Sequence, residues 1–465
     1  MTANNPGSVK IVLRDARRQG EAIQVSSPHH AGWMSKVTVG SVVVLALALA
    51  IADAIRQSHV KGVQNPNDFV TLYAGAICIT HACNPYSVPD LDKVLVNARG
   101  SSVRQDWSDQ LPVYPPTTIV LLLPLSLLSY KSATILWYSL SLAIYVFGLC
   151  WLFLFSSVLG ETRLIVRVGA VLLGLHFPKM LQCLGFGNPS LIVTGLLLFC
   201  VFDEAESRKI LRLICIAIAC LLKPPLALPL VVLVLFKDPK RTRDGWIATA
   251  LLALIFLALG LYTFLPPGMA HWRLDLSQNL ALGQRGGMNP SLRGLPSNTL
   301  LNIATLPGYF VTNPVSIRLI SFVVVVTLAV LYLIALNRLR KSALWKTNGY
   351  LLAVATLAAL TLLPVYHRFC DIGVLLLAVP WVVQEFSQRP KWQALVSAPL
   401  LALLYFSWER RIHLDQLAGV QLNVARFLYY RGDALLVVFL ACVLLFAMYS
   451  SRGRKIRTEL AVEGS

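Results

Sequence analysis

Long apolar runs recur along the whole chain, and they restrict its possible folds more than any other feature. Residues 37–55, 322–336 and 434–449 carry almost no charge, and a helix needs ~20 mostly apolar residues to cross a bilayer. Hydrophobic residues make up 56% of the 465 and charged residues only 14%, which leaves too little polar surface for a soluble protein of this size. The sequence therefore predicts an all-α membrane protein with many spans.

The positions of Lys and Arg predict how the chain is threaded. The net charge is +19, and the basic residues concentrate in short segments between apolar runs, as the positive-inside rule describes. No basic domain lies apart from the apolar runs, so this charge does not indicate a nucleic-acid partner. With the basic segments in the cytoplasm, the chain makes about twelve crossings of the cell membrane, and both termini lie inside. The predicted spans lie near residues 35–56, 133–158, 164–183, 188–203, 208–222, 225–236, 244–265, 318–337, 348–364, 371–386, 393–408 and 432–450.

This threading divides the chain into a membrane domain, 34–451, and two cytoplasmic tails, 1–33 and 452–465. The apolar stretch 117–130 does not fit as a crossing, because it would invert every later basic segment, so we expect a shallow or re-entrant segment there. The nine cysteines are scattered without a metal-binding spacing, which is typical of small apolar side chains.

Every segment that is unusual for a spanning helix falls on the outer side of this threading. Two long outer loops cover about 57–116 and 266–317. The corner GFGNPS at 185–190, the KPP break at 223–225 and YHRFCD at 366–371 lie on the same side. A functional site in this protein is therefore expected to face outside.

Asp68 is the first candidate, in the stretch NDFVTLYAGA. An acid in the first helical turn is favoured by the helix dipole, which gives Asp68 a purely structural explanation. The helix would lie in the plane of the membrane, with Phe69, Leu72, Tyr73 and Ala76 on its apolar face. Such a helix would also hold a carboxylate at the depth of a lipid headgroup, where it can act on a substrate.

Each other candidate has a structural and a functional interpretation, and the spacing does not decide between them. Asn188 either caps the next helix or lies where two glycines let a ligand approach closely. Lys223 is a cation in an apolar run, which indicates a site unless the side chain extends to the surface. YHRFCD, with His367, Arg368 and Asp371, is either a helix end in solvent or a site where His367 and Arg368 contact a phosphate. The turn-rich second outer loop adds Arg285, Asn289, Ser291 and Arg293, and Tyr73, Tyr114 and Asp371 are candidates for supporting roles.

Together, one carboxylate and several cations at an outer-leaflet pocket suit transfer from a phosphate-linked lipid. Cations and amides bind the departing phosphate, while a carboxylate accepts the proton of the attacking hydroxyl.

The residues also resemble a known family, the integral-membrane GT-C glycosyltransferases, and within it glycosyltransferase family 87. The resemblance rests on NDFVTLYAGA and NPYSV, then VYPPTTIVLLLPLSLL, GFGNPSLIVTGLL, LLKPPLALPL, NPSLRG and HRFCDIGVLLLAVP, in that order. It implies inverting transfer of a sugar, mannose by family analogy, from a polyprenyl-phosphate carrier on the extracytoplasmic face. It also implies that Asp68 is the catalytic base and that His367 orients the acceptor or the phosphate. Phe186 replaces the usual Gln of the corner motif, so no polar contact is expected there.

The resemblance leaves a divalent metal possible, although no cofactor is expected with certainty and no set of metal ligands is evident. The acceptor, a lipid or a glycan, stays open. Two other functions remain: a transporter or flippase of lipid-linked glycans, and a membrane transferase that moves an acyl or phospho group. A transporter would place polar residues along a path at mid-membrane, whereas the candidates here gather on one side.

Overall fold

The computed structural model describes most of the membrane domain. Contacts divide the chain into Met1–Leu45 and Ala46–Ser465, and the elements below belong to the second unit. The described residues are 44, 48, 67–99, 111–160, 162–202, 206–235, 237, 254–255, 271–285, 300–346, 348–364, 367, 369–388, 391–405 and 423–450.

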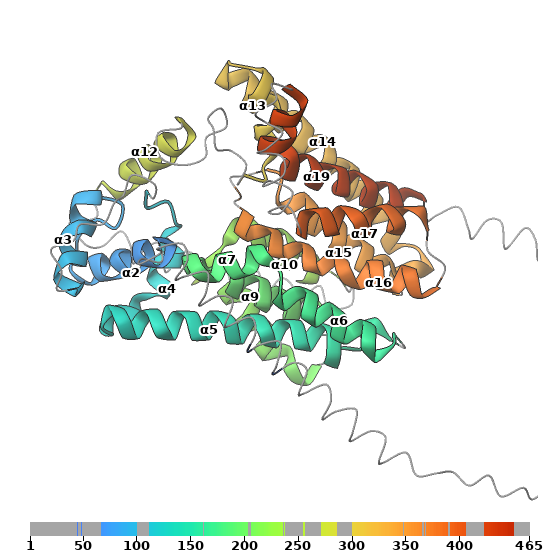
Figure 1. Ribbon diagram of the computed structural model, residues 1–465, viewed down its shortest axis with the longest axis horizontal. Coiled ribbons are helices and arrows are strands. Elements are labelled where there is room, and N and C mark those ends of the chain that lie inside the picture. The colour runs from blue at the N-terminus through green and yellow to red at the C-terminus, as the bar shows by residue number, and fades with distance from the viewer. Residues whose placement is uncertain are drawn as a thin grey trace, which may run out of the picture. The chain divides into compact units, whose positions relative to one another are not determined.

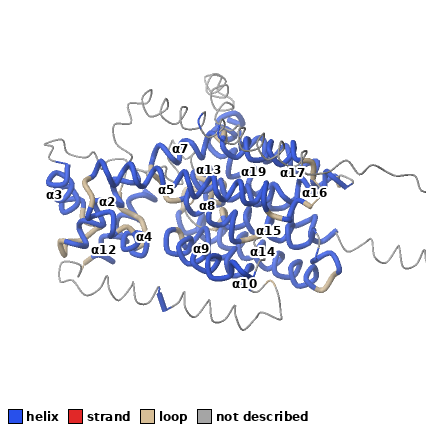
Figure 2. Tube along the Cα trace, turned by 90° about the horizontal axis from the view of Figure 1, so that it is seen from below, coloured by secondary structure: helices blue, strands red, loops and turns tan. Residues whose placement is uncertain are grey.

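Every element assigned in these residues is a helix (Figures 1 and 2). The first group is α2 (Asn67–Thr80), α3 (Val88–Arg99), α4 (Pro116–Leu121) and the 3-10 helix η2 (Leu123–Leu127). Next come α5 (Tyr130–Cys150), α6 (Leu164–Leu175), α7 (Pro178–Phe186), α8 (Ser190–Cys200), α9 (Lys209–Leu222) and α10 (Pro224–Leu235). The remainder includes α12 (Trp272–Arg285), α13 (Pro307–Phe310), α14 (Pro314–Arg340), α15 (Asn348–Thr361), the 3-10 helix η11 (Phe369–Ala378), α16 (Val379–Gln388), α17 (Trp392–Tyr405) and α19 (Asn423–Ser450).

Several of these helices are long and apolar enough to cross a membrane. Four pass by length and composition in the described part of the chain, at Tyr130–Phe155, Pro314–Arg340, Phe369–Ser387 and Arg431–Ser450. The α6–α7 pair, bent by 41°, makes a fifth if it is one span. The all-α, multi-span fold class is therefore confirmed. The number twelve stays a prediction, and the predicted span at 35–56 and most of the one at 244–265 lie outside the described residues.

Helix α8 lies in the centre of the packing, and all of its residues are buried. Its contact with α5 is unusually close: a Cβ added to Gly148 would clash with the Gly195 carbonyl oxygen. Only glycine permits two helix backbones to approach in this way. This packing fixes α8, and with it the corner that precedes the helix.

Helix α2 differs from its predicted form. Residues 68–79 are all buried, including Val70, Ala74 and Cys78, so the helix has no exposed polar face and is not amphipathic. It packs against α3, α4, α5, α7 and η2. The segment is apolar because the helix is buried on every side. This burial depends on neighbouring helices, so the positions of Phe69, Leu72, Tyr73 and Ala76 in the sequence could not reveal it.

Cys78 and Cys83 form a disulfide bond across the end of α2. The prediction that the nine cysteines serve only as small apolar side chains is therefore wrong for these two. The other seven are free thiols. Two cysteines five residues apart do not form a recognised pattern, so this disulfide bond could not be predicted from their spacing.

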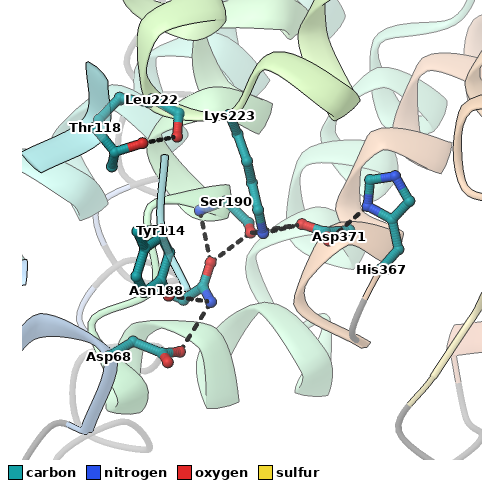
Figure 3. A network of polar contacts seen from close by, with 9 residues as sticks. All are labelled: Asp68, Tyr114, Thr118, Asn188, Ser190, Leu222, Lys223, His367 and Asp371. Atoms are coloured by element: carbon teal, nitrogen blue, oxygen red, sulfur yellow. Dashed lines mark hydrogen bonds and ion pairs between the residues drawn. The ribbon is translucent and has the colours of Figure 1, made fainter. Parts of the chain in front are cut away.

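The stretch 117–130 contains all but the first residue of the short helix α4, followed by η2, and not a continuous spanning helix. Thr117 donates a hydrogen bond to the Leu221 carbonyl at 2.9 Å, and Thr118 donates to the Leu222 carbonyl at 2.8 Å (Figure 3). These carbonyls belong to the last turn of α9, where no intrahelical donor is available. The contact therefore completes the end of α9, immediately before Lys223.

Candidate active site

The α7–α8 corner is built around Gly187, which ends α7 in the left-handed conformation with φ of 65°. A Cβ at this position would lie 2.6 Å from Cβ of Phe69 on α2. The Gly187 carbonyl accepts a hydrogen bond from the Trp137 indole at 2.8 Å. Glycine is required here both by the backbone conformation and by the close approach of α2, so the corner and the helix of Asp68 are held together.

Asn188 follows directly, and its two amide atoms have different partners. Its Oδ1 accepts from the Ser190 backbone N–H at 2.9 Å, the local turn expected of a helix-capping Asn. Its Nδ2 must then point the other way, where it donates to Asp68 Oδ2 at 2.8 Å and to the Tyr114 hydroxyl at 3.2 Å. Asn188 therefore serves as a cap and as a contact to the acid, so the two interpretations of this residue are compatible.

Lys223 lies in the break between α9 and α10, outside both helices. Its ammonium is 2.6 Å from Ser190 Oγ and 2.5 Å from Asp371 Oδ1. Burial lowers the pKa of the ammonium and the Asp371 carboxylate raises it, with a net pKa above its usual value. Lys223 is therefore charged at neutral pH and pairs with Asp371.

Asp371 and His367 complete the cluster from the third side. Asp371 Oδ2 lies 2.8 Å from His367 Nδ1, and Asp371 Oδ1 accepts from the Ser190 hydroxyl at 2.7 Å. Both residues are buried. Because an ionised carboxylate only accepts hydrogen bonds, His367 Nδ1 carries the proton.

The result is one continuous network that runs from Asp68 through Asn188, Ser190, Lys223 and Asp371 to His367 (Figure 3). It joins α2, the α7–α8 corner, the α9–α10 break and η11, which are more than 300 residues apart at the extremes. We call it the polar network.

Several predicted site residues meet in this network, and others do not. Asp68, Tyr114, Asn188, Lys223 and Asp371 are brought together with His367. Tyr73 instead donates to the Leu128 carbonyl at 2.7 Å and serves packing. The predicted candidates Asn289, Ser291, Arg293 and Arg368, and the side chain of Arg285, lie outside the described residues.

Ser190 was not predicted, although it links the two halves of the network. Its only signal in the sequence is the position two residues after Asn188, and serine at a helix start usually serves capping. Two further polar clusters were also missed. Asn279 on α12 donates to the Tyr86 and Pro112 carbonyls, and Lys179 pairs with Asp433 at 2.7 Å.

The first of these clusters connects α12, which belongs to the predicted second outer loop, to the polar network. The Tyr86 hydroxyl donates to the Tyr114 carbonyl at 2.7 Å, and Asn84 donates to Asp275 on α12. Helix α12 is thus attached to the segment that carries Tyr114. In the described part of the chain, no group of three or more His, Cys, Asp or Glu side chains could hold a metal ion.

Comparison with known proteins gives one match. Residues 113–365 match the model of glycosyltransferase family 87, which is more than half of the 465-residue chain. The matched part contains Tyr114, Asn188, Ser190 and Lys223, while Asp68 precedes it and His367 follows it. No curated protein and no solved structure matches the chain.

Proposed function

This chain belongs to glycosyltransferase family 87, and we propose that it transfers a sugar, mannose by family analogy, from a polyprenyl-phosphate carrier to a lipid or glycan acceptor. The transfer takes place at the extracytoplasmic face of the cell membrane and inverts the anomeric configuration. Asp68 is the general base, and Lys223 binds the phosphate.

The difference between the two carboxylates of the polar network carries this proposal. Both oxygens of Asp371 are occupied, one by Lys223 and Ser190 and the other by His367. Asp68 accepts one hydrogen bond, from Asn188 to Oδ2, and its Oδ1 has no partner among the described residues. Asp68 has no cation paired with it there either. Of the two, only Asp68 has a free, unneutralised oxygen that can accept a proton.

In the proposed reaction, the acceptor hydroxyl lies against Asp68 Oδ1 and passes its proton to that oxygen as it attacks the anomeric carbon. The bond from this carbon to the phosphate oxygen breaks, and its electron pair leaves with the phosphate. Attack opposite the leaving group inverts the configuration. The polyprenyl phosphate gains negative charge as it departs, so a fixed cation at Lys223 stabilises the transition state more than the ground state.

The disulfide supports the outward orientation of the site. Disulfide bonds persist in oxidising compartments and are rare in the cytosol. Cys78 and Cys83 lie at the end of the same helix that carries Asp68, and Cys78 is fully buried against α3. The first outer loop would accordingly fold beyond the cytosolic face.

We expect thiol counting to detect this bond in protein purified from membranes without reductant. Denatured protein treated with a maleimide polymer should show seven modified thiols before reduction and nine after it. A Cys78→Ser/Cys83→Ser variant should show seven in both conditions. Nine modified thiols without reduction would remove this support for the outer face.

A transfer assay tests the proposed activity itself. Purified protein in nanodiscs should consume one member of a panel of radiolabelled polyprenyl-phosphate sugars when total membrane lipid is present, and NMR of the product should show the inverted anomer. Consumption of nucleotide sugars alone would show that the donor class is wrong. Movement of an intact glycolipid between leaflets, without a new glycosidic bond, would favour the transporter interpretation.

A further inference from the structure

The last three residues of the polar network, Lys223, Asp371 and His367, differ in exposure, and this difference separates binding from positioning. The Lys223 side chain is 17% exposed, whereas those of Asp371 and His367 are 2% and 1% exposed. Exposure therefore falls along the network from Lys223 to His367. A substrate that enters from the side of Asp68 reaches Lys223 before it reaches the other two.

The hydrogen-bonding groups left unused by the protein also distinguish Lys223 from Asp371. The Lys223 ammonium has three N–H donors, and the described residues engage it through Ser190 and Asp371. One donor is left for a ligand. Asp371 uses both carboxylate oxygens within the protein, so it has no free oxygen to offer.

His367 has a free ring nitrogen, but it is closed off. Its Nε2 is buried without a hydrogen-bond partner, and it points away from Asp371 on the side far from Asp68 (Figure 3). The His367 carbonyl is also fixed, since it accepts from the Leu301 N–H at 2.9 Å. The ring is therefore oriented by its Nδ1 bond to Asp371 and presents no atom to the space beside Asp68.

We propose that Asp371 and His367 are positioning residues that hold the Lys223 ammonium, and that Lys223 alone of the three contacts the donor phosphate. This inference rests on the proposed function and assigns His367 a different role from phosphate or acceptor contact. Asp371 fixes the direction of the ammonium, and His367 fixes Asp371. The phosphate then binds the third ammonium donor, beside the Asp68 carboxylate.

Two substitutions at His367 separate positioning from contact, because each places an amide nitrogen near the position of one of the two ring nitrogens. The amide nitrogen of His367→Asn takes the place of Nδ1 and keeps the bond to Asp371. The amide nitrogen of His367→Gln reaches the place of Nε2 and loses that bond. We expect His367→Asn to keep kcat within about threefold of wild type and His367→Gln to lose about tenfold or more, the usual cost of one charge-assisted hydrogen bond.

The loss of activity should appear mainly in kcat. The Lys223 ammonium stabilises negative charge that develops on the phosphate in the transition state, and a misplaced ammonium stabilises it less. The reverse order, with His367→Gln the more active, would overturn the inference and leave the proposed function intact. Wild-type protein that consumes no polyprenyl-phosphate sugar would instead overturn the proposed function. Size-exclusion profiles and melting temperatures in detergent identify any variant that fails to fold.

A measurement on wild-type protein avoids the question of folding. Cryo-electron microscopy in nanodiscs with sugar-free polyprenyl phosphate should show the phosphate about 3 Å from Lys223 Nζ. Phosphate bound at His367 Nε2, or at neither residue, would contradict the assignment even if both variants misfold.

Discussion

Asp68→Asn is expected to reduce sugar transfer by about a thousandfold or more while leaving the protein folded. The loss is large because Asp68 both accepts the proton of the acceptor hydroxyl and orients that hydroxyl for attack. Asn has nearly the volume of Asp, and its carbonyl can still accept the hydrogen bond from Asn188 Nδ2 that now lies at 2.8 Å. It cannot accept the proton of the acceptor hydroxyl. Radiolabel transfer by the purified variant, at saturating donor and acceptor, measures the loss.

The matched control is Asp90→Asn, the same substitution at a carboxylate on α3, the helix that follows α2 in the chain. Asp90 pairs with Lys93 at 3.7 Å near the surface, and such pairs contribute little to stability, so this variant should transfer sugar at the wild-type rate. Equal transfer by Asp68→Asn and Asp90→Asn would exclude Asp68 as the base. The melting temperature of the Asp68 variant must stay close to that of wild type for a loss of transfer to count.

The sequence predicts that several distant segments share one side of the membrane, because the positive-inside rule assigns a side to each loop from its Lys and Arg residues; that side stays a prediction. Asp68, Asn188, Lys223 and His367 were assigned to one side by that rule alone, and the polar network joins all four (Figure 3). Each residue was ambiguous in isolation. The predicted common side was the reason to consider them together.

The interactions themselves were not predictable, because they depend on packing between segments far apart in the chain. The burial of α2 on every side needs its neighbours, and the sequence of one helix does not reveal them. Ser190 resembles an ordinary capping residue, and only the approach of Lys223 and Asp371 makes it the link of the network. The Cys78–Cys83 bond likewise depends on the turn that returns the chain to α2.

The second large effect concerns the Lys223–Asp371 pair, where stability and activity should separate. Lys223→Met leaves the Asp371 carboxylate, 2% exposed, without its cation. Breaking a buried pair from one side costs about 3–5 kcal/mol, because the remaining charge has lost its compensation. We expect a value near the lower end of that range, about 3 kcal/mol, because the Lys223 side chain is partly exposed. Thermal unfolding in detergent measures the change.

The double variant Lys223→Met/Asp371→Asn should recover most of that stability and none of the activity. Asn at 371 is uncharged, so no buried charge remains. Its carbonyl can accept from His367 Nδ1 in place of Oδ2, and its amide N–H can donate to Ser190 Oγ, whose hydroxyl then donates to Asn188 Oδ1. The phosphate, however, still lacks its cation. If the double variant regained transfer together with stability, Lys223 would be a structural counter-ion only. If it stayed as unstable as Lys223→Met, the ion pair would not be what holds this corner of the fold. Recovered folding without recovered transfer assigns the cation to the donor phosphate.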